Sequence, residues 1–154
     1  MKSLLVIIVA AFLGSCASVQ KGEESEAVGA PAAEVATPTT LIESFQALDT
    51  ILKPEEIEQI RNAPEGEMIQ YHFSLGMWMR NNWGLWQGSK LSKWFNERGI
   101  FHPDDMSAII LDSYWHHLCG LPINFEEQAE VYKQYWNKVQ EKEAGAQQGA
   151  APDA

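Results

Sequence analysis

The chain has 154 residues, 45% hydrophobic and 21% charged, which is ordinary for one globular domain with tails. Its formal net charge is −10, and its 11 Lys and Arg residues form no basic run. Because a negatively charged domain repels phosphate backbones, this composition argues against nucleic acid as a partner.

The first residues, 1–15, are expected to be an export signal. Ten apolar residues run from Leu4 to Leu13 and would span about 15 Å as a helix, half of a bilayer core, so they do not form a membrane span. The sequence LGSC follows and resembles the lipobox of bacterial lipoproteins. The resemblance implies lipid on Cys16 and, because Ala17 rather than Asp comes next, residence at the outer membrane. The alternative is an ordinary signal peptide with an incidental cysteine.

Two segments have compositions that are typical of disorder. Residues 16–39 comprise the lipidated cysteine and a linker rich in Ala, Glu, Ser, Gly, Thr and Pro, without an aromatic residue. A flexible linker of this length reaches roughly 25–29 Å, which would keep the domain close to its membrane. Residues 139–154, rich in Ala, Gly and Gln, are predicted to be a disordered tail.

Residues 40–138 are predicted to form one all-α domain. No segment alternates between apolar and polar residues over any length, so no sheet is expected. Five to six short helices would pack as a single irregular or orthogonal bundle. Their start signals are Thr40 with Glu43, Pro54, Ser89, Pro103 after His102, and Asn124 with Glu127. The last helix is expected to be anchored by Val131, Tyr132, Tyr135 and Trp136.

A helix over about Glu65 to Asn82 is predicted to lie in the middle of the bundle. It is apolar on two faces, one bearing Met68, Tyr71, Leu75 and Met79 and the other bearing Ile69, Phe73, Gly76 and Met77. Apolar residues most of the way round a helix indicate neighbours in several directions. Four tryptophans at helical positions are also expected to fill the core: Trp78, Trp94, Trp115 and Trp136.

Two motifs carry a resemblance to a known family. The sequence HFSLGMWMRNNWGLW occupies residues 72–86, followed by Ser89 and Leu91, and HPDDMS occupies residues 102–107. Together they resemble a bacterial family of small domains of unknown function, over about residues 44–136. The resemblance implies a small helical fold and brings no activity, cofactor or site residue.

Arg80 at the end of the predicted central helix is the first candidate for a special role. A charge near a core is normally paired, so we expect a structural ion pair with a carboxylate such as Asp112 or Asp105, and Asp112 is preferred. The alternative is an anion site that Arg80 shares with Asn81 and Asn82.

The loop after this helix is the best candidate for a ligand-binding surface. Trp83 and Trp86 lie beside Asn81, Asn82 and Gln87. Flat rings next to amides suit stacking on sugars. The alternative is that both rings fold back over the bundle.

Three groups at helical spacing raise the question of a metal or a thiol enzyme. Asp112, His116 and Cys119 lie at i, i+4 and i+7, but a helix separates the outer two by about 10 Å, too far for one ion. We therefore predict no metal, no cofactor and no catalytic residue. Cys119 is expected to be a buried, unreactive thiol, and His72 a core histidine bonded to a carbonyl or carboxylate.

Two functions remain after this reading of the sequence. The first is a lipid-anchored, non-enzymatic module of the bacterial cell envelope that binds another envelope protein or a glycan. The second is a hydrolase or glycan-binding protein that acts on cell-wall or surface polysaccharide. No nucleophile elbow, Gly-rich phosphate loop or H-E-x-x-H motif is present, which favours binding over catalysis.

Overall fold

The structure, a computed structural model, describes residues 36–149. The expected signal peptide, Cys16, most of the linker and residues 150–154 lie outside this range. Within it the chain consists of helices and turns without a strand, which confirms the all-α prediction. None of the helices in this range has the length and apolar character that crossing a membrane requires.

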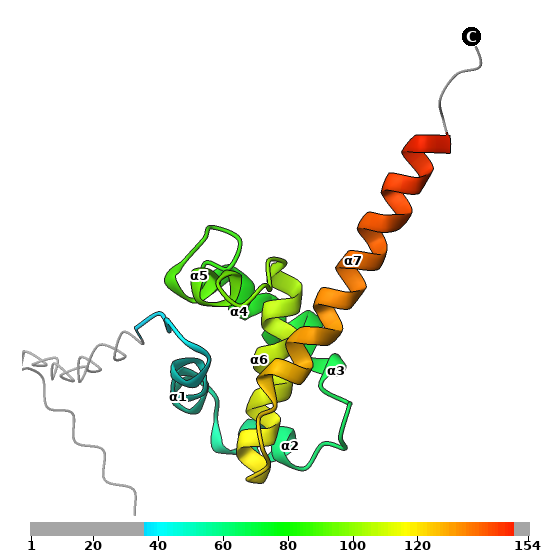
Figure 1. Cartoon of the computed structure of the whole chain (residues 1–154). Coiled ribbons are helices and arrows are strands. Elements are labelled where there is room, and N and C mark those ends of the chain that lie inside the picture. The colour runs from blue at the N-terminus through cyan, green and yellow to red at the C-terminus, as the bar shows by residue number, and fades with distance from the viewer. Residues whose placement is uncertain (1–35, 150–154) are drawn as a thin grey trace, which may run out of the picture. The chain divides into compact units, whose positions relative to one another are not determined.

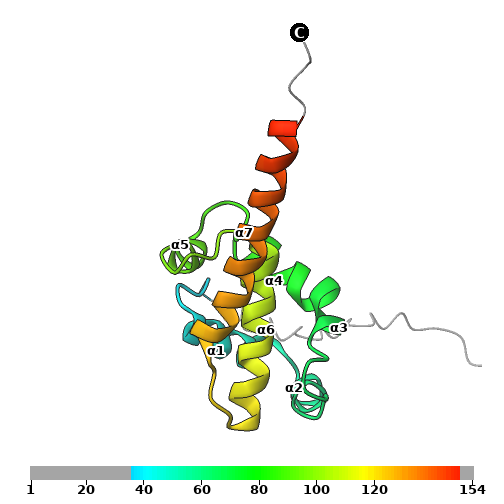
Figure 2. The same ribbon diagram turned by 45° about the vertical axis from the view of Figure 1, so that its right-hand side comes forward.

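The helix α6 (Pro103–Cys119) is the centre of the domain, and α1, α2, η1, α4, α5 and α7 all contact it. Figures 1 and 2 show the other helices arranged around it. Its middle is apolar or small on nearly every side, so it can be covered all round. The buried residues of α6 are Met106, Ser107, Ile109, Ile110, Leu111, Ser113, Tyr114 and Trp115. The prediction that residues 65–82 form the central helix is therefore wrong.

Both ends of α6 follow the sequence signals. The ring nitrogen Nδ1 of His102 accepts a hydrogen bond from the backbone N–H of Asp104, and Pro103 takes the first helical position, where no N–H is needed. At the other end Gly120 adopts φ +68°, a left-handed conformation that favours glycine. The next N–H, that of Leu121, bonds to the carbonyl of His116 and so closes the helix.

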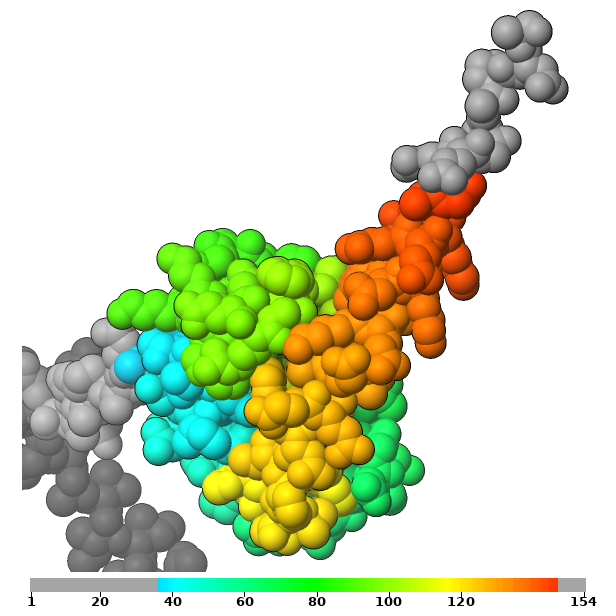
Figure 3. Space-filling view, viewed as in Figure 1, coloured from blue at the N-terminus to red at the C-terminus, as the bar shows by residue number. Residues whose placement is uncertain are grey.

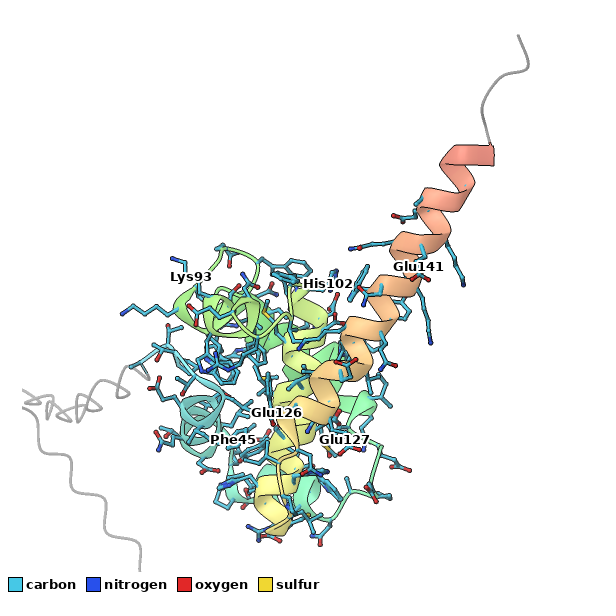
Figure 4. All side chains as sticks on the ribbon, viewed as in Figure 1. Phe45, Lys93, His102, Glu126, Glu127 and Glu141 are labelled. Atoms are coloured by element: carbon cyan, nitrogen blue, oxygen red, sulfur yellow. The ribbon has the colours of Figure 1, made fainter. Side chains whose placement is uncertain are left out.

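The shorter helices begin where the caps predict. They are α1 (Leu41–Ile51), α2 (Pro54–Arg61) and α5 (Lys90–Asn96). Thr40 accepts from the backbone N–H of Glu43, and Ser89 caps α5 in the same way. The carboxylate of Glu43 bonds to Thr39 rather than to Thr40, so the ordered entry includes one residue of the expected linker. In Figure 4 the ring of Phe45 extends from α1 toward α6, where it lies 5.9 Å from the ring of Tyr114.

The segment expected to be one regular helix contains a wider turn. It consists of α3 (Ile69–Tyr71), the π-helical turn η1 (His72–Gly76) and α4 (Met77–Asn82). One predicted face is covered by the core, with Met68 and Met79 buried. The other face is open: Phe73 is 73% exposed, and Ile69 and Met77 are also exposed. Of this second face only Gly76 is buried, next to Ser107 and Leu111 of α6, so the predicted burial of both whole faces is wrong.

The six tryptophans also divide differently from the prediction. Trp115 is buried, and its ring N–H donates to the carbonyl of Ala63 at 3.0 Å. Trp94 is partly buried, whereas Trp78 and Trp136 are exposed rather than core residues. Both are helical residues, which shows that helical spacing alone does not decide which way a large ring faces.

The last helix, α7 (Phe125–Gly149), is longer than predicted. Its first half packs on the core through Phe125, Ala129 and Tyr132, and the ring of Phe125 meets Trp94 and Phe95 of α5. Val131 and Tyr135, which were expected to be anchors, are exposed. Figures 1 and 3 show its C-terminal part extending beyond the other helices. The predicted tail thus includes ordered helix, because Ala, Gln, Glu and Lys have high helix propensity even without an apolar face.

We expect two phenylalanine truncations to separate the covered and open surfaces. Phe95→Ala empties a site in the core, where Phe95 is 0% exposed, and should lower the free energy of unfolding by about 3–5 kcal/mol. Phe73→Ala removes a ring that faces solvent and should change it by less than about 0.5 kcal/mol. Urea unfolding measures both; equal losses would mean that the open face of η1 is covered in solution.

Candidate ligand-binding site

A buried arginine joins the two motif segments. The side chain of Arg80, in a residue only 6% exposed, places Nε 3.0 Å from Asp104 Oδ1. Its Nη1 donates to the hydroxyl of Ser107 at 2.7 Å, and that hydroxyl donates to the carbonyl of Asp104 at 2.9 Å. His72 approaches the same carboxylate, with Nε2 3.5 Å from Oδ1. The end of the helical segment 69–82 is thereby fixed to the first turn of α6.

The expected partner of Arg80, Asp112, is not part of this cluster. It lies eight residues further along α6 than Asp104, a rise of about 12 Å, out of reach of the guanidinium. Burial instead raises the pKa of Asp112, with the charge of His116 opposing the shift. Arg80 is buried and paired with Asp104, as expected of a structural ion pair, and Asn81 and Asn82 are not among its hydrogen-bond partners.

Close packing at Gly76 allows the arginine to lie where it does. A methyl group added at Gly76 would be 3.2 Å from Arg80 Nη1 and 3.6 Å from Ser107 Oγ. The guanidinium cannot retreat without breaking its bonds to Ser107 and Asp104. A side chain at this position would therefore displace the guanidinium from its present contacts.

Aromatic side chains from other parts of the chain pack against the outer side of the same turn of α6. The rings of His102 and Trp136 stack with centroids 5.3 Å apart, and the edge of Trp86 meets His102 at 6.0 Å. The ring N–H of Trp136 donates to Asp105 Oδ2 at 2.6 Å. Burial raises the pKa of Asp105, and the hydrogen bond from Trp136 opposes this rise. Trp136 is thus held both by its face and by its edge.

His102 caps the first turn of α6 with its ring. Its Nδ1 accepts from the N–H of Asp104 at 3.3 Å and lies 3.4 Å from the carboxylate oxygen Oδ2 of the same residue. The cap therefore fixes the ring of His102 beside Asp104 at the start of the helix.

Next to this stack lies a groove of about 520 Å³ between the turn at residues 99–102 and one face of α7. In Figure 4 His102 lies beside α7 near the start of α6. Phe101 is 72% exposed and leaves its ring open. The groove is lined by Gly99, Phe101, His102, Lys133, Trp136, Asn137 and Gln140. We refer to this set as the aromatic groove.

The residues predicted for ligand binding do not form one surface. Trp83 is 3% exposed and belongs to the core, with the edge of its ring against Trp78. Trp86 is 51% exposed and contacts His102, next to the aromatic groove. Asn81, Asn82 and Gln87 are exposed, and the amide of Asn82 is bonded to the carbonyl of Trp78. The loop thus places only the ring of Trp86 next to the groove. The prediction that Trp83 binds a ligand is wrong, because Trp83 is a core residue.

The residues considered for metal or thiol chemistry lie apart. Within residues 36–149 no group of three His, Cys, Asp or Glu is placed to hold an ion. His116 Nδ1 bonds to the carbonyl of Pro122 at 2.6 Å. Cys119 is exposed, with Sγ 3.6 Å from the carbonyl of Arg61, so the prediction of a buried thiol is wrong. Its place at the end of α6 explains this, since the chain leaves the core there.

Sequence reasoning missed most of the aromatic groove. Lys133, Trp136, Asn137 and Gln140 are spaced at i, i+3, i+4 and i+7, which places them on one face of a helix. This spacing alone indicates a shared helix face. It does not indicate that Phe101 and His102, some thirty residues earlier, lie opposite that face.

We predict opposite effects for two aspartates of α6. Asp104→Asn leaves the buried Arg80 without its charged partner and should lower stability at pH 7 by about 1.5–3 kcal/mol. Asp112→Asn removes a charge that burial disfavours and should be at least as stable as the wild type at pH 7. Urea unfolding of each variant is the measurement.

The pH dependence adds a second check on Asp112. Because burial raises the pKa of Asp112, the folded chain holds this proton more tightly than the unfolded chain. The stability from protonation is fully present below the unfolded value of about 3.9 and is lost as the pH rises through the folded value. Asp112→Asn should therefore gain on the wild type between pH 4 and 7. A loss at pH 7 would indicate an ion pair after all.

Comparison with known proteins identifies a family but no characterised relative. No curated protein matches the chain, and no solved structure matches it. A family model described as a domain of unknown function, DUF6794, matches residues 37–118, which is just over half of the chain. The match includes Arg80 with its partners and the turn at His102, but not α7. The chain therefore belongs to this family, DUF6794, which confirms the expected membership in a family of unknown function.

Proposed function

We propose that this protein is a non-enzymatic, lipid-anchored module of the bacterial cell envelope that binds a glycan in the aromatic groove. The observation that carries the proposal is the composition of the groove. An open Phe101 ring and the Trp136 ring lie next to the amides of Asn137 and Gln140. Aromatic faces pack against the apolar side of a sugar ring, and amides bond to its hydroxyls.

The fixed orientation of Trp136 supports binding. Its ring is stacked on His102, and its N–H is bonded to Asp105, so two independent contacts restrict it. A side chain that is already ordered loses little conformational entropy when a ligand packs against it. The groove is therefore preorganised on the side that α7 provides.

The polar groups around the groove favour binding over hydrolysis. Glycoside hydrolases use two carboxyl groups that flank the bond to be broken. No Asp, Glu, Ser, Thr or Cys is among the residues that line the groove. Two carboxylates close to the lining residues are already engaged, Asp104 with Arg80 and Asp105 with the ring N–H of Trp136. The envelope hydrolase considered from the sequence is therefore the weaker candidate.

The cellular location rests on the sequence. The short apolar run and the LGSC motif favour export and acylation at Cys16, and Ala17 favours transfer to the outer membrane. A lipid anchor followed by a linker would hold the aromatic groove within reach of envelope polysaccharide.

The groove is tested with two equally exposed phenylalanines. Phe101→Ala should abolish the binding of saccharides detected on an array of bacterial cell-wall and surface glycans. Phe73→Ala, which removes a similarly exposed ring of η1 outside the groove, should leave it intact. Neither change should alter the melting temperature by more than a few degrees, because both rings face solvent. Equal binding by both variants, or no binding by the wild type, would contradict the proposed function.

The anchor is tested by changing its cysteine. Cys16→Ser removes the thiol that accepts lipid, so the protein should leave the membrane fraction or accumulate unprocessed. Metabolic labelling with a radioactive fatty acid and fractionation of the cells measure both effects. Cys119→Ser is the matched control and should remain labelled. Normal labelling of the Cys16→Ser protein would disprove lipidation at this position.

A further inference from the structure

We infer that the aromatic groove selects saccharides that carry a carboxylate, and that Lys133 binds this group. The inference rests on the proposed function, since it names the class of glycan that the same groove takes. The charge and the hydrogen-bond donors of the groove support this choice of saccharide, whereas the aromatic rings would accept neutral and acidic sugars alike.

The lining of the groove differs in charge from the chain as a whole. The protein has 21 Asp and Glu residues against 11 Lys and Arg, yet the groove is lined by one Lys and no acid. Three other hollows of the described chain each include carboxylates. These are Glu55 and Glu58 in one, Asp112 in a second, and Glu65 with Asp112 in a third. The lining of the groove therefore carries one cationic side chain and no carboxylate, unlike the linings of these three hollows.

The second argument is the position of Lys133. The stem of this side chain crosses Gly99, where an added methyl group would lie 2.7 Å from Cε and 3.4 Å from Nζ. Gly99 has φ +82°, so glycine serves both the turn and the close approach. Among the described residues no carboxylate lies within ion-pair distance of Lys133. The ammonium group thus lies next to Gly99 at the wall of the groove, without a carboxylate partner among the described residues.

The third argument is the balance of donors and acceptors. Besides the ammonium of Lys133, the groove is lined by the ring of His102 and the amide groups of Asn137 and Gln140. A carboxylate is an acceptor only, so it can accept from the ammonium and from the amide N–H groups. Asp104 and Asp105 are not among the lining residues, and the charge of Asp104 is paired with that of Arg80.

An acidic peptide carries the same charge, so the aromatic contacts decide between the two. The ring of Trp136 is fixed by Asp105 and His102 and presents one rigid edge of the groove. A rigid flat ring flanked by amides matches a sugar ring with its hydroxyls better than a flexible peptide, whose side chains would have to become ordered. We therefore assign the carboxylate to a sugar acid.

The test compares an acidic with a neutral trisaccharide by isothermal titration calorimetry on the full chain in neutral detergent. Trigalacturonate should bind the wild type at least tenfold more tightly than galactotriose at low ionic strength, and 0.5 M NaCl should reduce this preference. Lys133→Gln should remove the preference while retaining the weak binding of galactotriose. Lys138→Gln, the same change on α7 outside the groove, should retain it, and Lys133→Arg should restore most of it.

The other possible results would contradict the acidic preference, the assignment to sugars or the proposed function. Equal binding of both trisaccharides to the wild type, or an equal loss of preference in the Lys133→Gln and Lys138→Gln variants, would overturn the acidic preference and leave glycan binding in place. Binding of a triaspartate peptide as tightly as trigalacturonate would overturn the assignment to sugars. If neither trisaccharide bound and the glycan array showed no other ligand, the proposed function would fail together with this inference.

Discussion

The fold depends on the burial of one positive charge, the guanidinium of Arg80. A buried charge is strongly unfavourable unless it is paired and fully hydrogen-bonded. Asp104 and Ser107 meet this requirement from the first turn of α6, and the absence of a side chain at Gly76 leaves room for the contact. The pairing fixes the helical segment 69–82 against α6, which α1, α2, η1, α4, α5 and α7 all contact.

The same turn of α6 has an inner and an outer side. The inner side holds Arg80, and the outer side carries His102 and Asp105, which fix the ring of Trp136 from α7. The aromatic groove thus lies on the outer side of the helical turn whose inner side pairs with Arg80. A site supported in this way needs little rearrangement to accept a ligand, because its central ring is already ordered.

The surface is divided into regions of different chemistry. The stripe of Ile69, Phe73 and Met77 on α3, η1 and α4 is apolar and open within the described chain. The aromatic groove combines open rings with amides and one unpaired ammonium. Only the second region can discriminate between ligands by hydrogen bonds as well as by contact area, which is why it supports the more specific function.

By itself the sequence determined the local features, which are the helical class and the starts of four helices. Caps and prolines act on their own neighbours in the chain, so these starts could be predicted. They lie at Thr40, Pro54, Ser89 and Pro103. The tertiary structure decided which apolar faces are covered, so that Trp83 is buried while Phe73 and Trp136 are exposed. It also chose Asp104 over Asp112 as the partner of Arg80. Such choices depend on which helix lies opposite, and helical periodicity gives the direction of a side chain but not the neighbour that it meets.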